Sequence, residues 1–597
     1  MPELHFKGKE YVYNHHLTVP YRPLVAHPDK SIGDKAGNLI IHGDNLHALK
    51  ALLPRYAGKV DCIFIDPPYN TGNENWNYND NVDSPIMREW LDGNPVNKED
   101  MLRHDKWCCL MYPRLKLLHE LLSEDGSFWM TLDDNEIHRA RMVMDEIFGE
   151  ENFVGTIAWQ KIYTVKNSAR HFSEMHDYLI VYAKSENQWC RNLFGRTEEQ
   201  EEDYSNPDND PRGPWTTNAV QARNYYSLGQ YEIRSKEGKI FTPPKGTYWR
   251  ISKESFDELD ADGRIWWGSN GTSIPRIKKF LSEAKEGVVP ATIWLHRDAG
   301  TNAGAKEELR SIFSVSDDEL FITPKPVKLI SRILEIATNN NSLILDSFAG
   351  SATTAHAVLA QNAKDNGNRH FILVECEGYA DTLTAERVRR VINGYKYQGT
   401  QKEELLREKI TWSNFNGGKA HRRLLDQVRS LENLESHRFD GIKKTIKDGE
   451  LIVTGETRIT ERVGGLGGGF TYYTLGDPLD LDKMLTGESL PDYANIGAWL
   501  FHTATGEPLD PKGIREDESY LGESAAFHVW LIYKPELDFL KSRDAALTLR
   551  FAEKISEQRD KHHLVFAPAR FVPNKVLLPL GVEHAPLPFA LYRFERN

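Results

Sequence analysis

The stretch VDCIFIDPPYN, residues 60–70, decides the fold class. It begins as a short apolar run with the length of a buried strand. Pro67 and Pro68 then end the strand, because proline has no N–H to donate to a sheet ladder. Ligands bind at the carboxyl ends of the strands in an open α/β sheet. We therefore expect Asp66 and Tyr69, beside the two prolines, to face a ligand at such a strand end.

The side chains at this strand end fit one chemistry, the methylation of an exocyclic amine on a nucleic-acid base. The lone pair of such an amine is delocalised into the ring, so hydrogen-bond acceptors must face the amine before its nitrogen attacks a methyl donor. The carboxylate of Asp66 and the carbonyl of Pro67 are such acceptors. The ring of Tyr69 offers a face for an extruded base. Taken alone, these residues also fit a proline turn that closes a strand, with Tyr69 packed in the interior.

A second strand end carries the features of a cofactor site. Residues 342–346 (SLILD) form another apolar run, and the small-residue turn SFAGSATT, residues 347–354, separates it from a helical segment. Small residues in such a turn let backbone amides approach a ligand closely. Further on, an apolar run ends at Glu375, where nucleotide-binding βαβ units place the acid that binds a ribose diol. A Walker phosphate loop is excluded, because no G-K-[ST] follows the glycine.

The remaining segments of this half complete an α/β pattern. The predicted elements are a strand and Gly-Asp turn at 38–44, a helix at 113–122, and strands at 127–132 and 176–184. Asp133 and Asp134 follow one of these strands. Methyl transfer needs no metal, so we assign both to helix capping and expect no metal site.

Together these residues resemble the amino-group DNA methyltransferases of the β class, in which a D-P-P-Y motif precedes an F-A-G-S-G-T-T-like motif that binds S-adenosylmethionine. Three segments are also similar to the modification subunits of type III restriction-modification systems: DPPYNTGNENWNYND (66–80), HDKWCCLMYPRLKLL (104–118) and GRIWWG (263–268). The resemblance extends over residues 38 to 400. It implies an α/β fold with a Rossmann-like, S-adenosylmethionine-dependent methyltransferase sheet.

The resemblance implies a role for each matching residue. The catalytic group that binds the amine and stacks the base would be Asp66, Pro67, Pro68 and Tyr69. The cofactor would be bound by Gly43 and Asp44 on its adenine side, by Asp346, Phe348 and Gly350 around its methionine part with Ala349 and Thr353 in the same turn, by Glu375 at its ribose, and by Lys325 and Pro326 of the TPKP segment that closes the pocket. Ala352 stands where the family has its second glycine. The cost of its methyl group depends on whether the backbone there needs a positive φ.

Residues 185–321 are irregular in pattern, with aromatic residues beside basic ones. The family inserts its target-recognition domain at this place, where Lys and Arg would contact phosphates and Arg and Asn would read base edges. The candidate DNA-binding residues are Arg223 and Arg276 in this region, with Lys161, Lys166 and Arg170 in a polar stretch that resembles a mobile loop closing around DNA. Alternatives stay open for each residue. The run 276–279 is typical of a solvated helix face, and Trp266 with Trp267 is typical of a core.

The predicted domain order is a first methyltransferase part at 1–184, target recognition at 185–321, a second methyltransferase part with the cofactor motif at 322–400, a helical linker at 401–439 and a C-terminal α+β domain at 440–597. Within it, residues 402–433 predict a charged helical segment. The glycine-rich run 464–469 lacks the Lys of a phosphate loop and predicts a flexible turn before a strand at 470–475. The resemblance implies dimerisation or docking of a partner subunit for the C-terminal domain.

Composition limits the class of protein. The 597 residues carry a net charge of −13, which leaves only a local surface for DNA phosphates. The chain is long enough for several domains. Five cysteines without C-x-x-C spacing indicate neither a zinc site nor a disulfide framework. Neither a signal peptide nor an apolar run of roughly 20 residues is present, so we expect a cytoplasmic protein without a membrane span.

Three functions remain open. The first is the modification and recognition subunit of a type III restriction-modification system, a homodimer that methylates N6 of a flipped adenine in double-stranded DNA beside a separate ATP-dependent restriction subunit. The second is an N4-cytosine or stand-alone adenine methyltransferase without a restriction partner. Cytosine enzymes more often carry Ser in place of Asp66, so Asp66 favours adenine. The third is a non-catalytic recognition subunit, which Ala352 favours and the intact D-P-P-Y motif opposes.

Overall fold

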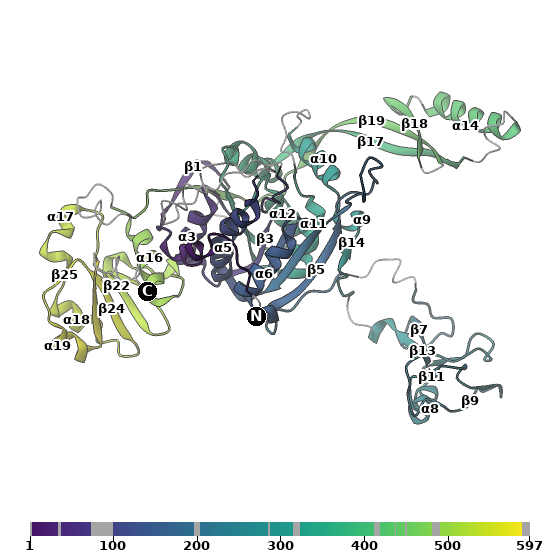
Figure 1. The fold of residues 1–597 in the computed structure, drawn as a ribbon, viewed down its shortest axis with the longest axis horizontal. Helices are drawn as coiled ribbons and strands as arrows, with labels where there is room; N and C mark the ends of the chain where they lie inside the picture. Colours follow the sequence, from purple (N-terminus) through teal and green to yellow (C-terminus); the bar gives the residue numbers. More distant parts are fainter. Residues whose placement is uncertain are drawn as a thin grey trace. The chain divides into compact units, whose positions relative to one another are not determined.

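The computed structural model describes residues 3–33, 37–72, 100–195, 203–283, 287–313, 323–410, 418–435, 437–447, 450–479 and 490–587. The chain forms two compact units (Figure 1). One consists of Met1–Arg191 with Ala291–Asn597, and the other of Asn192–Pro290. The second unit lies within the region predicted for target recognition.

A ten-stranded sheet is the centre of the first unit. In spatial order its strands are β1 (Leu24–Ile32), β20 (Phe470–Leu475), β2 (Leu39–His42), β16 (His370–Glu375), β15 (Leu343–Asp346), β3 (Val60–Ile65), β4 (Leu122–Leu132), β6 (His176–Ala183), β5 (Phe153–Gln160) and β14 (Ile293–Trp294). Neighbours from β20 to β4 pair in parallel, whereas β6 runs antiparallel to both β4 and β5. The strands predicted from apolar runs are confirmed.

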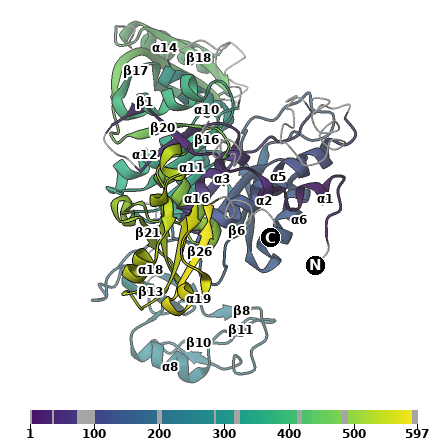
Figure 2. The same cartoon turned by 90° about the vertical axis from the view of Figure 1, so that its left-hand side faces the viewer.

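Helices cover both faces of this sheet. They are α1 (Lys9–Val12), α2 (His15–Thr18), α3 (Asn45–Tyr56), α5 (Arg103–Leu121), α6 (Ile137–Phe148), α9 (His296–Ala299), α10 (Asn302–Phe313), α11 (Val327–Ala337), α12 (Thr353–Asp365) and α13 (Glu386–Asn393). The connection β3-α5-β4 steps along the sheet in one direction and β15-α12-β16 steps in the other. Because such crossovers are right-handed, α5 and α12 lie on opposite faces (Figure 2).

The change of direction falls between β15 and β3, which are hydrogen-bonded neighbours. β15 leads into the small-residue turn, and β3 leads into the D-P-P-Y turn. In open α/β sheets a ligand binds at such a topological switch point. The sheet therefore places the two predicted motifs beside each other.

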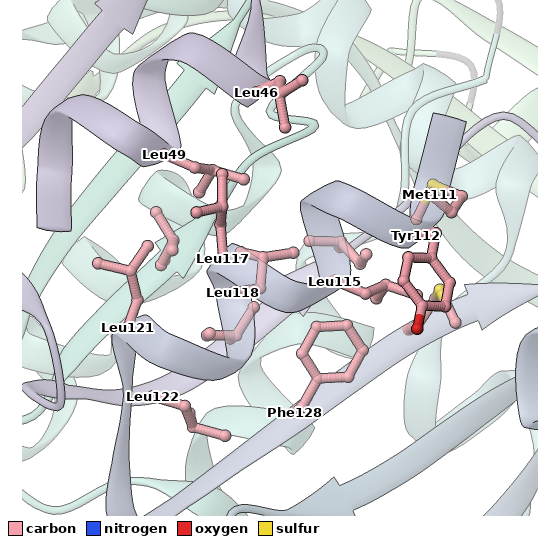
Figure 3. Close-up of a cluster of buried hydrophobic side chains, with 14 of the residues drawn as sticks. Leu46, Leu49, Met111, Tyr112, Leu115, Leu117, Leu118, Leu121, Leu122 and Phe128 are labelled. Carbon is pink, nitrogen blue, oxygen red and sulfur yellow. The ribbon is translucent and has the colours of Figure 1, made fainter. Parts of the chain in front are cut away.

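The core of the first unit lies between the sheet and the helices α3, α5 and α6 that cover one of its faces (Figure 3). Leu46 and Leu49 of α3 pack with a nearly continuous apolar surface of α5, which includes Leu115 and Leu118, and with Phe128 of β4. All five side chains are completely buried. Burial of this kind contributes roughly 1.5 to 3 kcal/mol for each large apolar side chain. The packed core therefore holds the strand end that carries Asp66 in place.

The second unit is a small assembly of short strands. It contains β7 (Trp215–Ala219), β8 (Gln221–Ala222), β9 (Ile233–Arg234), β10 (Ile240–Phe241), β11 (Tyr248–Trp249), α8 (Lys253–Ala261), β12 (Ile265–Trp266) and β13 (Arg276–Phe280). Its apolar core includes Trp249, Phe256 and Trp267. Of the two residues interpreted as core, Trp267 is buried and Trp266 is only partly buried.

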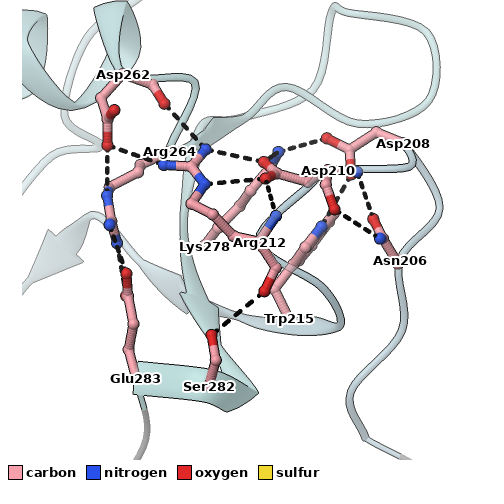
Figure 4. A network of polar contacts seen from close by, with 10 residues as sticks. All are labelled: Asn206, Asp208, Asp210, Arg212, Trp215, Asp262, Arg264, Lys278, Ser282 and Glu283. Atoms are coloured by element: carbon pink, nitrogen blue, oxygen red, sulfur yellow. Dashed lines mark hydrogen bonds and ion pairs between the residues drawn. The ribbon is translucent and has the colours of Figure 1, made fainter.

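An ion-pair network stabilises the second unit (Figure 4). The ammonium group of Lys278 is buried and pairs with Asp208 and Asp210, and Arg264 forms a two-pronged pair with Glu283. The run Arg276–Lys279 belongs to the strand β13, so its interpretation as a helix face is wrong. In a strand alternate side chains face opposite ways, which lets this basic run include one buried lysine.

The C-terminal third departs from the predicted boundaries. Residues 402–409, predicted as helix, belong to the strand β17 (Gly394–Lys409), which pairs with β19 (Glu450–Gly464); β18 (Gly441–Lys447) completes this sheet beside α14 (Lys419–Glu435). Strand β20 then returns to the large sheet. A Cβ atom at Gly469 would lie 2.4 Å from the carbonyl oxygen of Ile32, so the close approach of these two segments of the chain requires glycine at this position.

The final segment forms a second α/β layer structure. Its elements are α16 (Tyr493–Thr505), β21 (Tyr520–Glu523), β22 (Phe527–Leu531), α17 (Leu537–Leu540), β23 (Ala546–Leu547), α18 (Leu549–Ile555), β24 (His562–Ala567), β25 (Ala569–Arg570), α19 (Asn574–Leu577) and β26 (Val582–Pro586). Successive residues of β22, such as Val529 and Trp530, enter two different apolar clusters, as expected for a strand buried on both faces. No helix in the described ranges combines the length and apolarity needed to span a bilayer.

Candidate active site

The predicted site residues gather at one edge of the large sheet. Adjacent parallel strands β2, β16, β15 and β3 end, respectively, in Gly43 and Asp44, in Glu375, in Asp346 with its small-residue turn, and in Asp66. The carboxyl ends of parallel strands meet at the same edge. Segments far apart in the sequence thus form one site, although residues 73–80 of the motif segment 66–80 lie outside the described residues.

Both carboxylate oxygens of Asp66 accept hydrogen bonds. Oδ1 accepts from the Thr131 hydroxyl at 2.6 Å, and Oδ2 accepts from the Lys325 ammonium at 2.5 Å. The Lys325 side chain is 9% exposed and that of Asp66 is 22% exposed. A charge-assisted pair in such a setting fixes the carboxylate in one orientation, while each oxygen keeps a second lone pair for another donor.

Lys325 connects the catalytic turn with the cofactor turn. Its carbonyl oxygen accepts a hydrogen bond from the Thr353 hydroxyl at 3.0 Å, and its ammonium nitrogen lies 5.0 Å from the centroid of the Tyr69 ring. The resemblance assigns Lys325 to the cofactor pocket. In the structure its charged end instead faces Asp66 and Tyr69, and its backbone faces the cofactor turn.

Buried side chains other than Lys325 also hold the D-P-P-Y turn in place. The Trp107 indole donates a 2.7 Å hydrogen bond to the Pro68 carbonyl. Asn70, at a φ of 57°, donates through its amide to Glu136 at 2.5 Å. Glu136 is completely buried and also contacts His104 at 2.5 Å; burial raises the pKa of Glu136 to about 7. Such contacts orient the turn that carries Tyr69.

Tyr69 keeps its hydroxyl neutral. Burial, and next the charge of Asp66, hold the pKa of this phenol well above its usual range. A neutral ring can stack against a base without the cost of removing a phenolate charge from water.

The cofactor turn is fixed by its own backbone. Asp346 accepts hydrogen bonds from the Thr354 hydroxyl at 2.5 Å and from the Phe348 N–H at 3.0 Å. The Gly350 N–H donates to Glu375 Oε2 at 2.7 Å, and the Ala349 N–H donates to the carbonyl of Val374. Burial raises the pKa of Asp346 to about 7 and also raises that of Glu375.

Ala352 occupies a position that favours glycine. Its backbone lies in the left-handed region at φ 62° and ψ 37°, immediately before α12, and its methyl group is completely buried. A non-glycine residue in this region costs roughly 1 to 2 kcal/mol. Burial of the methyl group offsets about 0.8 kcal/mol of that cost, and the turn retains its shape with alanine.

Asp44 has a structural duty at the far end of the edge. It caps α3 by accepting hydrogen bonds from the Leu46 and His47 N–H groups, and it pairs with the buried Arg114 at 3.2 Å. Although burial alone would raise it, the Arg114 charge and the His47 hydrogen bond hold the pKa of Asp44 below its usual range. Asp44 therefore stays ionised.

The edge fits a cationic cofactor that carries a ribose. Asp346 and Glu375 are buried carboxyl groups, for which a nearby cation restores ionisation. The second lone pair on each Glu375 oxygen leaves an acceptor for a diol. Gly350 and Ala352, both at positive φ, shape the turn beside these carboxyl groups.

The predicted DNA-binding residues are dispersed. Lys161 pairs at 2.5 Å with the buried Asp177, whereas Lys166 and Arg170 are exposed on the loop between β5 and β6. Arg223 and Arg276 are exposed in the second unit, where Arg276 donates to the Thr217 hydroxyl at 2.7 Å. The contact of all five with DNA stays a prediction.

Sequence reasoning missed the residues that support the motif. They are Trp107, Thr131, Glu136 and Asp177. Glu136 stands just after Asp133 and Asp134, and Asp133 accepts a hydrogen bond from the Asn135 N–H rather than from a residue inside α6. The available signal was position alone, because Thr131 and Asp177 lie at ends of predicted strands and Glu136 follows such an end closely.

Comparisons with known proteins show the family of the chain. A family model described as DNA methylase matches residues 60–386. The chain is 32% identical over 398 residues to the type III restriction-modification enzyme StyLTI Mod subunit of Salmonella typhimurium, covering 62% of this chain and 59% of that relative. It is 27% identical over 454 residues to the EcoP15I Mod subunit of Escherichia coli, covering 68% of each. It is 30% identical to the type II methyltransferase M.KpnI of Klebsiella pneumoniae, covering 57% of this chain and 81% of that protein.

Proposed function

This chain belongs to the DNA methylase family, and from that premise we propose that it transfers a methyl group from S-adenosylmethionine to N6 of an adenine extruded from double-stranded DNA. The observation that carries the proposal is the fixed Asp66 carboxylate, at the end of β3 and directly beside the β15 strand that leads into the cofactor turn. An acceptor for the amine and a turn for a methyl donor thus share one switch point.

The residues of the D-P-P-Y turn orient the amine. Asp66 accepts one amine hydrogen and the Pro67 carbonyl accepts the other, which aims the nitrogen lone pair and stabilises the positive charge that develops during attack. Thr131 and Lys325 hold the Asp66 carboxylate in place before the base arrives, so no reorganisation is needed at the moment of reaction. Tyr69 stacks on the base, which offsets part of the cost of unstacking it from DNA.

The cofactor supplies the methyl group as an electrophilic sulfonium. Glu375 would hold its ribose and Asp346 would face its positively charged part, with Gly43, Phe348, Ala349, Gly350, Thr353 and Pro326 around it. Desolvation of Asp346 and Glu375 favours binding of a cation, because both carboxyl groups gain a counter-charge.

Similarity to two type III Mod subunits supports a place in a type III restriction-modification system. In such a system this chain would act as a homodimer and supply DNA recognition to a separate ATP-dependent restriction subunit. The second unit, with exposed Arg223 and Arg276, would read the target. Similarity to a type II methyltransferase keeps the stand-alone adenine or N4-cytosine enzyme as the second candidate.

The test is sequencing of DNA from cells that express the chain, with detection of modified bases at single-nucleotide resolution. We expect N6-methyladenine on one strand of a short asymmetric motif, and its loss in Asp66→Ala. Methylation at N4 of cytosine would transfer the proposal to the second candidate. DNA without any modified base, from cells that contain folded protein, would refute methyl transfer.

A further inference from the structure

The loop between β5 and β6 leaves the sheet at the edge that carries the active site. β6 runs antiparallel to β4, and β4 runs parallel to β3, so the amino end of β6 lies on the side where β3 ends in Asp66. β5 is antiparallel to β6 and ends on that same side. We call residues 161–177 the finger.

Contacts between its two sides hold the finger in shape. At its base the Ile162 N–H donates to the Met175 carbonyl at 3.2 Å, and Lys161 pairs with the buried Asp177 at 2.5 Å. Halfway along, the Lys166 N–H donates to the Ser173 hydroxyl at 2.9 Å. The two sides are thus clasped, and residues 167–172 form its tip.

The tip exposes an aromatic ring beside basic groups. The side chain of Phe172 is 90% exposed, and its neighbours Arg170 and His171 are also exposed. Transfer of this exposed ring from water into an apolar slot is favourable in free energy. Arg170 can contact a phosphate next to that slot.

We propose that Phe172 is a wedge that enters the DNA base stack and occupies the place left by the flipped adenine. The inference rests on the proposed function, because only a base taken out of the duplex leaves such a slot. Apolar side chains that insert between base steps are an established means of opening a duplex. Phe172 directly precedes the clasp residue Ser173, so its ring leaves the tip from a backbone position that the clasp fixes.

The test compares methyl transfer to two duplexes that contain the recognised sequence and differ only opposite the target adenine. One carries thymine there, and the other carries an abasic site, which leaves the adenine unpaired. The full-length chain is used, with the variants Phe172→Ala and Phe172→Trp. Phe571→Ala is the matched control, because Phe571 is also exposed, at 61%, but lies in the C-terminal segment.

We expect Phe172→Ala to lose roughly 10- to 100-fold in kcat/KM on the paired duplex, in line with the value of one stacked ring, and to recover most of that loss on the abasic duplex. Phe172→Trp and Phe571→Ala should keep the wild-type ratio between the two duplexes. Fluorescence of 2-aminopurine at the target position should rise on binding of wild type and much less on binding of Phe172→Ala.

Three results would distinguish a failure of the wedge proposal from a failure of the proposed function. Full activity of Phe172→Ala on the paired duplex would overturn the wedge and leave the proposed function intact. An equal loss on both duplexes, with an unchanged melting temperature, would also overturn it, because Phe172 would then serve binding in general. Absence of methyl transfer by the wild-type chain to either duplex would refute the proposed function itself.

Discussion

Replacement of Lys325 by methionine tests the centre of the site. The ammonium and carboxylate groups lie 2.5 Å apart, and at an effective dielectric constant of about 20 their attraction is roughly 7 kcal/mol. Desolvation of side chains that are 9% and 22% exposed offsets most of this attraction. We take the net value of the pair as about 2 to 3 kcal/mol, below that of a fully buried pair.

If the pair orients Asp66 for the amine, Lys325→Met should lower the single-turnover rate by about 30- to 150-fold, which is the kinetic equivalent of that energy. The dissociation constant for S-adenosylmethionine should stay unchanged or fall, because the variant removes a positive charge near a cationic ligand. Calorimetric titration with the cofactor and quenched-flow methylation at saturating cofactor and DNA measure the two quantities separately.

Lys328→Met is the matched control, since Lys328 is an exposed lysine on the first turn of the following helix, α11. It should leave both quantities at the wild-type value. The reasoning is refuted if Lys325→Met weakens cofactor binding while the rate at saturating cofactor is preserved. Lys325 would then serve the cofactor pocket alone.

Three further predictions concern the two turns. Tyr69→Ala should weaken stacking of the flipped base by roughly 1 to 3 kcal/mol, seen as weaker binding of the target duplex, whereas Tyr69→Trp should be tolerated; equal behaviour of both would make Tyr69 structural. Glu375→Ala should raise the dissociation constant for S-adenosylmethionine by roughly 10-fold or more, because it removes the ribose acceptor and also frees the Gly350 N–H; an unchanged titration would remove Glu375 from the cofactor site. Burial raises the pKa of Asp346 to about 7, so the folded cofactor-free protein favours the protonated acid. The contribution of Asp346 to the stability of this folded protein is therefore complete below about pH 4 and is lost as the pH rises through 7. Cofactor affinity should accordingly fall below pH 7 in wild type but not in Asp346→Asn, and titrations with the same pH dependence in both would contradict the role of Asp346.

Basic residues in the second unit have contacts that the sequence pattern does not predict. Arg264 and Lys278 both lie in predicted aromatic-basic segments, yet Lys278 is buried against Asp208 and Asp210, and Arg264 pairs with Glu283. Their charges stabilise the unit itself. Arg276, exposed at the start of the same strand, remains the candidate for DNA contact.

The sequence by itself determined the local elements of the catalytic half. Val60–Ile65 is a strand because its apolar run is ended by two prolines, and residues 342–354 give a strand, a turn and a helix because small residues follow an apolar run. These features depend on the chain within a few residues, and local pattern records them. The residue types of the D-P-P-Y turn likewise indicated its chemistry.

Only the tertiary structure decided which of these residues touch one another. The pairing of Lys325 with Asp66 joins residues 259 positions apart, and the support of Asn70 by Glu136 depends on how α6 follows β4. Residues 402–409 have the composition of a helix, but they form a strand because β19 supplies a partner for their backbone. The burial and pairing of a side chain are properties of the whole fold, and periodicity along the chain does not record them.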